Sequence, residues 1–200
     1  METSWKTVTG NLYKGVLIQV WCNIAAAIFA FIAVISAVGD LASGDLFGAV
    51  AWGFWDYMEL AASIGALYGF WVFFSNINPW KALVANEDAK AVGNIYTATM
   101  LQMIAIVLAF IPFVGIVGII LNIVAWFMLL LAYSNLKNSA TFPAGAKQGA
   151  SKIFTAMILN LIALVIGWIP LIGIIGSILS IVAFFMTLSG WKCIANSEQA

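Results

Sequence analysis

The chain has 200 residues, of which 64% are apolar and only 8% are charged, whereas a soluble domain is about 45–50% apolar and 25% charged. This composition excludes a water-soluble fold and predicts an all-α integral membrane protein. Eight lysines balance eight acidic residues without a basic patch, so nucleic acid is not an expected partner. The absence of histidine and arginine excludes a His-ligated haem, a His-containing zinc site and a Ser-His-Asp triad, and we expect no cofactor or metal.

The apolar stretches are long enough for six membrane spans, because a helix that crosses the bilayer needs about 20 residues. The first stretch, of about 22 residues, is longer than the 7–15-residue core of a cleaved signal peptide, so we interpret it as an uncleaved anchor. Little chain remains outside the spans, which predicts a single membrane domain over residues 1–200. The predicted spans are residues 17–38, 57–75, 95–111, 114–133, 153–169 and 172–190.

A short amphipathic segment follows the second span. Asn78 and Pro79 form a good helix start, with Asn at the cap and Pro at the first helical position. The apolar side chains after them fall on one stripe, and Gly93 is expected to break the helix. The sequence therefore predicts a helix over residues 79–92 that lies at the cytoplasmic interface.

The lysines predict the orientation of the spans. They precede the first span, follow the last one, and occupy the connections between spans two and three and between spans four and five, whereas the other three connections have none. By the positive-inside rule, both termini and the two longer connections face the cytoplasm. We expect the protein to lie in the cytoplasmic (inner) membrane of a prokaryote. Cys22 and Cys193 then lie near the reducing side and are expected to be free thiols.

A helical hairpin is written twice at an offset of 58 residues. The segment from Ile95 through Ile111-Pro112 to Met128 matches the segment from Ile153 through Ile169-Pro170 to Met186. Each proline ends its incoming helix, and the glycines after it favour a sharp reversal. These turns predict hairpins that span the membrane fully, with a re-entrant hairpin as the alternative.

A fainter third copy occupies the start of the chain, where Gly10-Asn11-Leu12-Tyr13 matches Gly93-Asn94-Ile95-Tyr96. The repeat units are then residues 10–76, 93–135 and 151–193. Since each unit returns the chain to the same side, we predict three tandem antiparallel hairpins related by a pseudo-threefold axis along the membrane normal.

Polar residues recur at equivalent places in these units. They either hydrogen-bond between helices as structural contacts or line a polar path near the repeat axis. The candidate polar path consists of Gln19, Gln102 and Asn160 in the odd-numbered spans and Ser63, Asn122 and Ser180 in the even-numbered spans.

Asp56 and Glu59 are the acidic pair nearest to the second span. The repeat aligns Asp56 with Gly115, at the outer end of the span, among aromatic residues typical of a membrane interface. Because they are three residues apart, the two carboxylates share one helix face. They are a candidate outer-face cation or proton site, with a solvated interfacial pair as the alternative.

The sequence favours a structural or interaction protein of the membrane: a scaffold, a subunit of a membrane complex or a hairpin protein that shapes the bilayer. The expected partners are lipid, other membrane subunits or a second copy of the chain. The alternative is a passive channel or transporter for a small neutral solute, which would use the polar path. An enzyme is not expected, because the polar groups at membrane depth are amides and hydroxyls without a base or a metal ligand beside them.

Overall fold

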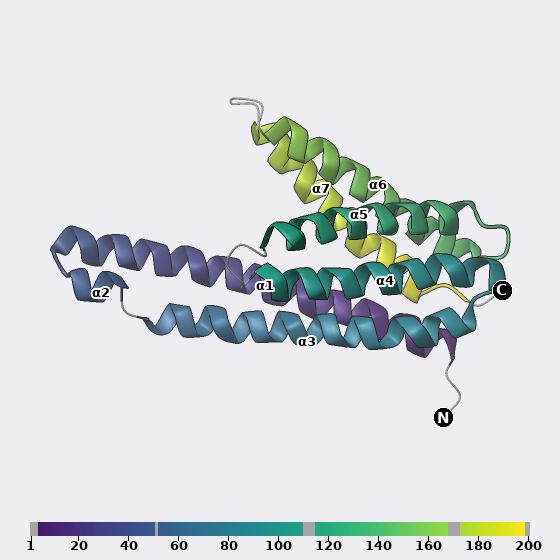
Figure 1. Ribbon diagram of the computed structural model, residues 1–200, viewed down its shortest axis with the longest axis horizontal. Coiled ribbons are helices and arrows are strands. Elements are labelled where there is room, and N and C mark those ends of the chain that lie inside the picture. The colour runs from purple at the N-terminus through teal and green to yellow at the C-terminus, as the bar shows by residue number, and fades with distance from the viewer. Residues whose placement is uncertain (1–3, 51, 110–114, 168–172, 199–200) are drawn as a thin grey trace. The chain divides into compact units, whose positions relative to one another are not determined.

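The computed structural model describes residues 4–50, 52–109, 115–167 and 173–198, and these residues form helices and no strand. Six of the helices are long and apolar enough to cross a membrane, which confirms the predicted all-helical class and suggests an integral membrane protein. The predicted turns at Pro112 and Pro170 lie outside the described residues. The helices, labelled in Figure 1, are α1 (Trp5–Ser43), α2 (Leu46–Val50), α3 (Phe54–Leu83), α4 (Asn86–Ala109), α5 (Gly115–Asn138), α6 (Ala144–Gly167) and α7 (Gly173–Ala195).

The helices are longer than the predicted spans at the ends that carry the lysines. Helix α6 begins at Ala144, nine residues before its predicted span, and its 24 residues extend about 36 Å, beyond the roughly 30 Å of a bilayer core. The added turns are polar in places, but Ala146, Gly149 and Ala150 are buried within them. Packing of these small residues therefore extends the helix where hydropathy alone predicts its end.

Residues 79–92 do not form the separate interfacial helix that the sequence predicts. Helix α3 continues to Leu83 with Pro79 inside it, and after a break of two residues α4 begins at Asn86. Ile77 and Trp80, on either side of Pro79, are fully buried. Their burial explains why the helix continues through a residue that usually ends one.

The connection between α1 and α2 is a helix-terminating glycine motif. Gly44 adopts a left-handed backbone with φ of 89°, a conformation that suits glycine. The amide of Gly44 donates to the carbonyl of Leu41, and the amide of Asp45 donates to the carbonyl of Asp40. This pair of hydrogen bonds satisfies the last carbonyls of α1, so the chain reverses directly after that helix.

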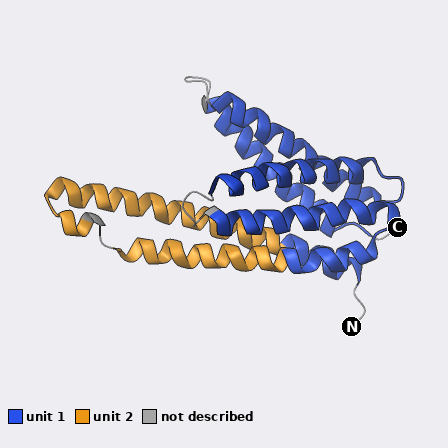
Figure 2. Ribbon diagram, in the orientation of Figure 1, with its two compact units in different colours: residues 1–13, 74–200 blue, residues 14–73 orange. Residues whose placement is uncertain are grey.

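The chain forms two compact units, shown in Figure 2: unit 1, residues Met1–Tyr13 with Phe74–Ala200, and unit 2, residues Lys14–Phe73. In unit 2, α1 and α3 pack antiparallel through a pair of glycines. A Cβ atom added to Gly15 would lie 2.6 Å from the backbone nitrogen of Phe73, and one added to Gly69 would lie 2.6 Å from that of Gln19. The two backbones therefore touch directly.

In unit 1, α4 packs against α5, α5 against α6 and α6 against α7 (Figure 1). Helices α6 and α7 are antiparallel: Gly149 meets the carbonyl of Gly190 at one end, and Gly176 meets that of Ala163 at the other. Gly118 of α5 meets the carbonyl of Ala105 in α4 in the same way. The starts of α4 and α6, their ends at Ala109 and Gly167, and the starts of α5 and α7 all differ by 58 residues.

Burial recurs at positions that the predicted repeats make equivalent, including positions near the start of the chain. The largest buried aliphatic side chains form two sets of equivalent positions in the predicted repeats, and each is at most 3% exposed. One set lies in the odd-numbered predicted spans or just before them, and the other lies near the ends of the even-numbered ones. The sets are Leu12, Ile95 and Ile153, and Ile77, Leu136 and Ile194.

Aromatic side chains form the core of unit 1 at the end of the helices that carries the lysines. The ring of Trp80 lies 6.2 Å from that of Phe142 and 5.9 Å from that of Trp191. Trp5 adds an edge contact to Phe142, and its Nε1 donates a hydrogen bond to the hydroxyl of Ser197. Trp5 thereby joins the start of α1 to Ser197, just beyond the end of α7.

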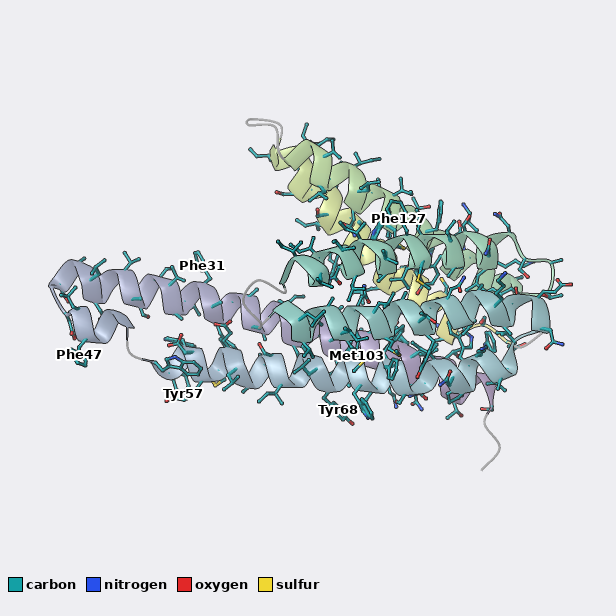
Figure 3. All side chains as sticks on the ribbon, viewed as in Figure 1. Phe31, Phe47, Tyr57, Tyr68, Met103 and Phe127 are labelled. Carbon is teal, nitrogen blue, oxygen red and sulfur yellow. The ribbon has the colours of Figure 1, made fainter. Side chains whose placement is uncertain are left out.

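Large apolar side chains cover the outside of the helices. Phe31 is 67% exposed and Tyr68 is 61% exposed, and Figure 3 shows both side chains pointing away from the helix pair that carries them. Exposed apolar surface of this extent is expected for helices surrounded by lipid, because hydrocarbon solvates such side chains and water does not.

Candidate functional site

The antiparallel register of α6 and α7 brings two of the predicted polar residues together. Because Gly176 lies against Ala163, Asn160 faces the segment of α7 that carries Ser180. Both side chains line an open hollow of about 440 Å³, which also includes Ser177 and the small residues Gly167 and Gly176. Small residues here leave room between the helices, and the polar groups line that room.

A second hollow adds a polar residue from α5. It has a volume of about 500 Å³ and lies between α5 and α6, with Asn122 and Asn160 as its polar residues. Apolar side chains, including Trp126 and Phe127, form the rest of its wall. Asn160 therefore lies where the two hollows meet, and we name Asn122, Asn160 and Ser180 the amide face.

The three residues of the amide face share one depth along their helices. Asn122 is seven residues from Gly115, Asn160 is seven from Gly167, and Ser180 is seven from Gly173, the helix ends opposite the lysines. Seven residues of helix correspond to about 10 Å. In a bilayer with a core about 30 Å thick, this depth falls within the hydrocarbon.

The amide face is exposed, and its hydrogen-bonding groups are open. The side chains of Asn122, Asn160 and Ser180 are all exposed, and none of the residues that the structure describes forms a side-chain hydrogen bond with them. Moving an amide from water into hydrocarbon without a hydrogen bond costs about 4–8 kcal/mol. If this face lies in hydrocarbon, polar groups from outside these helices would stabilise it.

The remaining residues of the predicted polar path lie elsewhere. Gln102 is half-buried on α4, also seven residues from the helix end, and it lines neither hollow. Gln19 and Ser63 belong to the other compact unit, where the backbone of Gln19 lies against Gly69, six residues along α3 from Ser63. The convergence of Gln19, Gln102 and Asn160 on one axis stays a prediction.

Asp56 has a structural contact at the start of α3. Its Oδ2 accepts a hydrogen bond of 2.7 Å from the amide of Gly53, three residues earlier, as in a capping box. Glu59 is half-buried one turn further along. Within the described ranges, no group of three or more potential metal-ligating side chains occurs. A cation or proton site at this pair stays a prediction.

Both cysteines are free thiols, as expected. Cys22 lies against Gly65, where an added Cβ would be 2.6 Å from its sulfur. Cys193 accepts a hydrogen bond of 3.4 Å from the Lys152 ammonium, which also donates to Ser189 at 2.9 Å. The two hydrogen bonds of Lys152 join α6 and α7 near their lysine-bearing ends.

Sequence reasoning missed the buried carboxylate of Asp88. It is 3% exposed, and its Oδ2 accepts a hydrogen bond of 2.8 Å from the Thr141 hydroxyl. In the sequence, Asp88 is one of several polar residues between two apolar stretches, and nothing distinguishes it from its exposed neighbour Glu87. Only a partner 53 residues away reveals its burial.

Comparisons of the chain with protein-family models, with curated proteins and with solved structures find no match.

Proposed function

We propose that this protein is an interaction subunit of the membrane that binds a second copy of itself through the amide face. The observation that supports the proposal is the set of three exposed polar side chains at one depth of otherwise apolar helices. Ser, Asn and Gln in membrane helices commonly hydrogen-bond across helices, at about 0.6–2 kcal/mol for each bond. A second amide face supplies such bonds, whereas lipid tails do not.

A second copy suits this surface because amides and hydroxyls both donate and accept hydrogen bonds. The same patch on two subunits can therefore satisfy itself across a twofold axis. The hollow between α5 and α6, walled by Trp126 and Phe127, offers space for apolar side chains of the partner beside the polar contacts. Association would cover the open groups and fill the hollows together.

The proposed subunit consists of three tandem hairpins with both termini in the cytoplasm of a prokaryotic cell. The 58-residue offset of the helix bounds and the matching buried positions support the repeats. The distribution of the lysines supports the orientation. The proposal includes no enzymatic step, because the amide face offers neither a base nor a metal ligand.

A passive pore for a small neutral solute is the second candidate. It is favoured by one observation: two hollows of about 440 and 500 Å³ meet at Asn160 and carry amide and hydroxyl groups. Such groups can replace the hydration of a neutral solute without binding ions strongly. In this case, the amide face would line a path, and its polar groups would be satisfied by water and solute.

Association in lipid tests the proposal. Fluorescently labelled protein is diluted in liposomes, and the fraction of dimer is measured by single-molecule photobleaching. Replacing Asn122 and Asn160 with leucine and Ser180 with alanine removes at least three hydrogen bonds, about 2 kcal/mol, so the dissociation constant should rise roughly 30-fold. The matched control is Asn23→Leu, which removes an exposed amide from α1 and should leave the dimer unchanged.

A monomeric wild-type protein at all dilutions, or equal dimer fractions for the triple variant and the wild type, would overturn the self-association. Entry of glycerol and urea into the same liposomes, followed by light scattering, tests the pore. Flux above that of empty vesicles, lost in the triple variant and retained in Asn23→Leu, would support the second candidate instead.

A further inference from the structure

A separate hollow lies in unit 1, at the end of the helices that carries the lysines. It has a volume of about 270 Å³ and forms where the end of α3, the first turn of α4 and the connection between α5 and α6 come together. Asp88 and Thr141 are its polar side chains, and the rings of Trp5 and Phe142 form part of its wall. Asn160 lies 16 residues into α6, about 24 Å of helix from this connection, so the hollow is distinct from the amide face.

The buried carboxylate of Asp88 has no counterion among the residues that the structure describes. Its residue is 3% exposed, and Thr141 Oγ1 donates a 2.8 Å hydrogen bond to its Oδ2. The other oxygen, Oδ1, accepts no side-chain hydrogen bond from the described part of the chain. Asp88 lies in the first turn of α4. One negative oxygen is therefore left for a ligand.

Two of the lysines at this end of the unit have contacts away from Asp88. The Lys147 ammonium donates to the carbonyl of Ala140, and the Lys81 side chain lies beside Gly93, where an added Cβ would be 3.4 Å from its Nζ. Lys90 is exposed and lines a neighbouring hollow that also reaches Asp88. Burying a carboxylate without a cation is unfavourable, so a cation from outside the chain would be stabilised at Asp88.

We propose that this hollow binds a primary ammonium group, such as that of ethanolamine. Its three N–H donors match Asp88 Oδ1 and the lone pairs of Thr141 Oγ1, and the charge can lie against the faces of Trp5 and Phe142. The lining offers one carboxylate, whereas Mg²⁺ or Ca²⁺ takes six or more oxygens. A quaternary ammonium has no N–H donor for Asp88, so a primary amine is preferred over choline.

Two sources can supply this group: the headgroup of an aminophospholipid and a free amine. The hollow lies at the end of the helices that carries the lysines, where the proposed orientation places the cytoplasmic headgroups. The shared chemistry is the ammonium with a short carbon stem, and the two sources differ in whether acyl chains anchor it.

Native mass spectrometry of the full-length protein, released from nanodiscs of equal phosphatidylethanolamine and phosphatidylcholine, tests the lipid source. We expect at least tenfold enrichment of phosphatidylethanolamine, lost in Asp88→Asn. The matched control is Glu87→Gln, which removes an exposed carboxylate from the same helical turn and should keep the enrichment. Calorimetric titration with free ethanolamine, its monomethyl and dimethyl derivatives and choline tests the free amine.

Each outcome has a defined reading. Lipid enrichment that depends on Asp88 supports the headgroup source, and ethanolamine binding without lipid enrichment supports the free amine. The methylation series needs no variant, so it remains decisive if Asp88→Asn fails to fold: affinity should fall at least tenfold from ethanolamine to choline. The proposal would be overturned if neither phosphatidylethanolamine nor ethanolamine bound, or if the affinity were equal along the methylation series. Binding that is unchanged in a folded Asp88→Asn protein would also overturn it.

Discussion

Replacing Gly69 with alanine is expected to force α1 and α3 apart. An added Cβ would lie 2.6 Å from the backbone nitrogen of Gln19 and 2.8 Å from the carbonyl oxygen of Gly15, whereas ordinary van der Waals contact begins at 3.4 Å. The helices must therefore separate by about 0.8 Å. Neither contact can be relieved by rotating a side chain, because both atoms belong to the backbone.

The expected loss of stability is about 2 kcal/mol. Overpacking a tight contact costs about 1–3 kcal/mol, and clashes with two backbone atoms place this site at the upper end. The gain in helix propensity from glycine to alanine, up to about 1 kcal/mol, offsets part of that cost. Gly10→Ala is the matched control: no atom lies within 4 Å of its added Cβ, so stability should stay equal or rise by up to about 1 kcal/mol.

The assay is unfolding of the full-length protein in mixed micelles, titrated with sodium dodecyl sulfate and followed by circular dichroism. The double variant Gly15→Ala/Gly69→Ala adds a second check, because the two glycines face each other. One separation of the helices relieves both contacts, so the double variant should lose less than the two single variants together. Equal stability of Gly69→Ala and Gly10→Ala, or full additivity in the double variant, would refute the direct backbone contact.

Three further predictions concern the buried indole of Trp80, the cap of α3 and the orientation of the chain in the membrane. The buried Nε1 of Trp80 has no hydrogen-bond partner among the described residues. The stability of Trp80→Phe in micelle unfolding should therefore stay within about 1 kcal/mol of the wild type, whereas Trp80→Ala should lose about 3–5 kcal/mol. Equal losses for the two variants would show that Nε1 has a partner. Asp56→Ala removes the capping contact with Gly53 and should lower the stability by about 0.5–2 kcal/mol in the same assay. Glu59 makes no capping contact among the described residues, so Glu59→Ala should lower the stability by less than about 0.5 kcal/mol. The reverse order would contradict the capping role of Asp56. In a cysteine-free background, a membrane-impermeant maleimide added to intact cells should label Ser43→Cys and not Glu198→Cys, and labelling of the second variant would reverse the orientation that the lysines predict.

The amide face could be predicted in part, because the spacing of residues along a helix is a local property. The 58-residue offset relates Gln102 to Asn160 and Asn122 to Ser180, and each of these residues lies seven residues from a bound of its helix. Asn160 and Ser180 line one hollow because of a contact between the backbones of α6 and α7, where Gly176 lies against Ala163. A sequence shows that a residue is small, but it does not show which carbonyl the residue touches.

The helix over residues 79–92 shows where local signals fail. Asn78 and Pro79 carry a strong helix-start signal, and Gly93 carries a helix-breaking one, yet Pro79 and Gly93 both lie inside helices. Burial of Ile77 and Trp80 in the aromatic core outweighs the hydrogen bond that Pro79 cannot make. Propensity is a difference of one to a few kcal/mol, and tertiary packing of large side chains exceeds it.

The sequence by itself determined the class of this protein, six long apolar helices, because the free energy of a helix in lipid depends on composition and length. It also showed which polar residues recur at equivalent positions along the apolar stretches. Only the tertiary structure decided which of them meet, how far each helix extends and that Asp88 is buried beside Thr141. The physical reason is that these features depend on contacts between residues distant in the chain, and a carboxylate becomes unusual only when the fold removes the water around it.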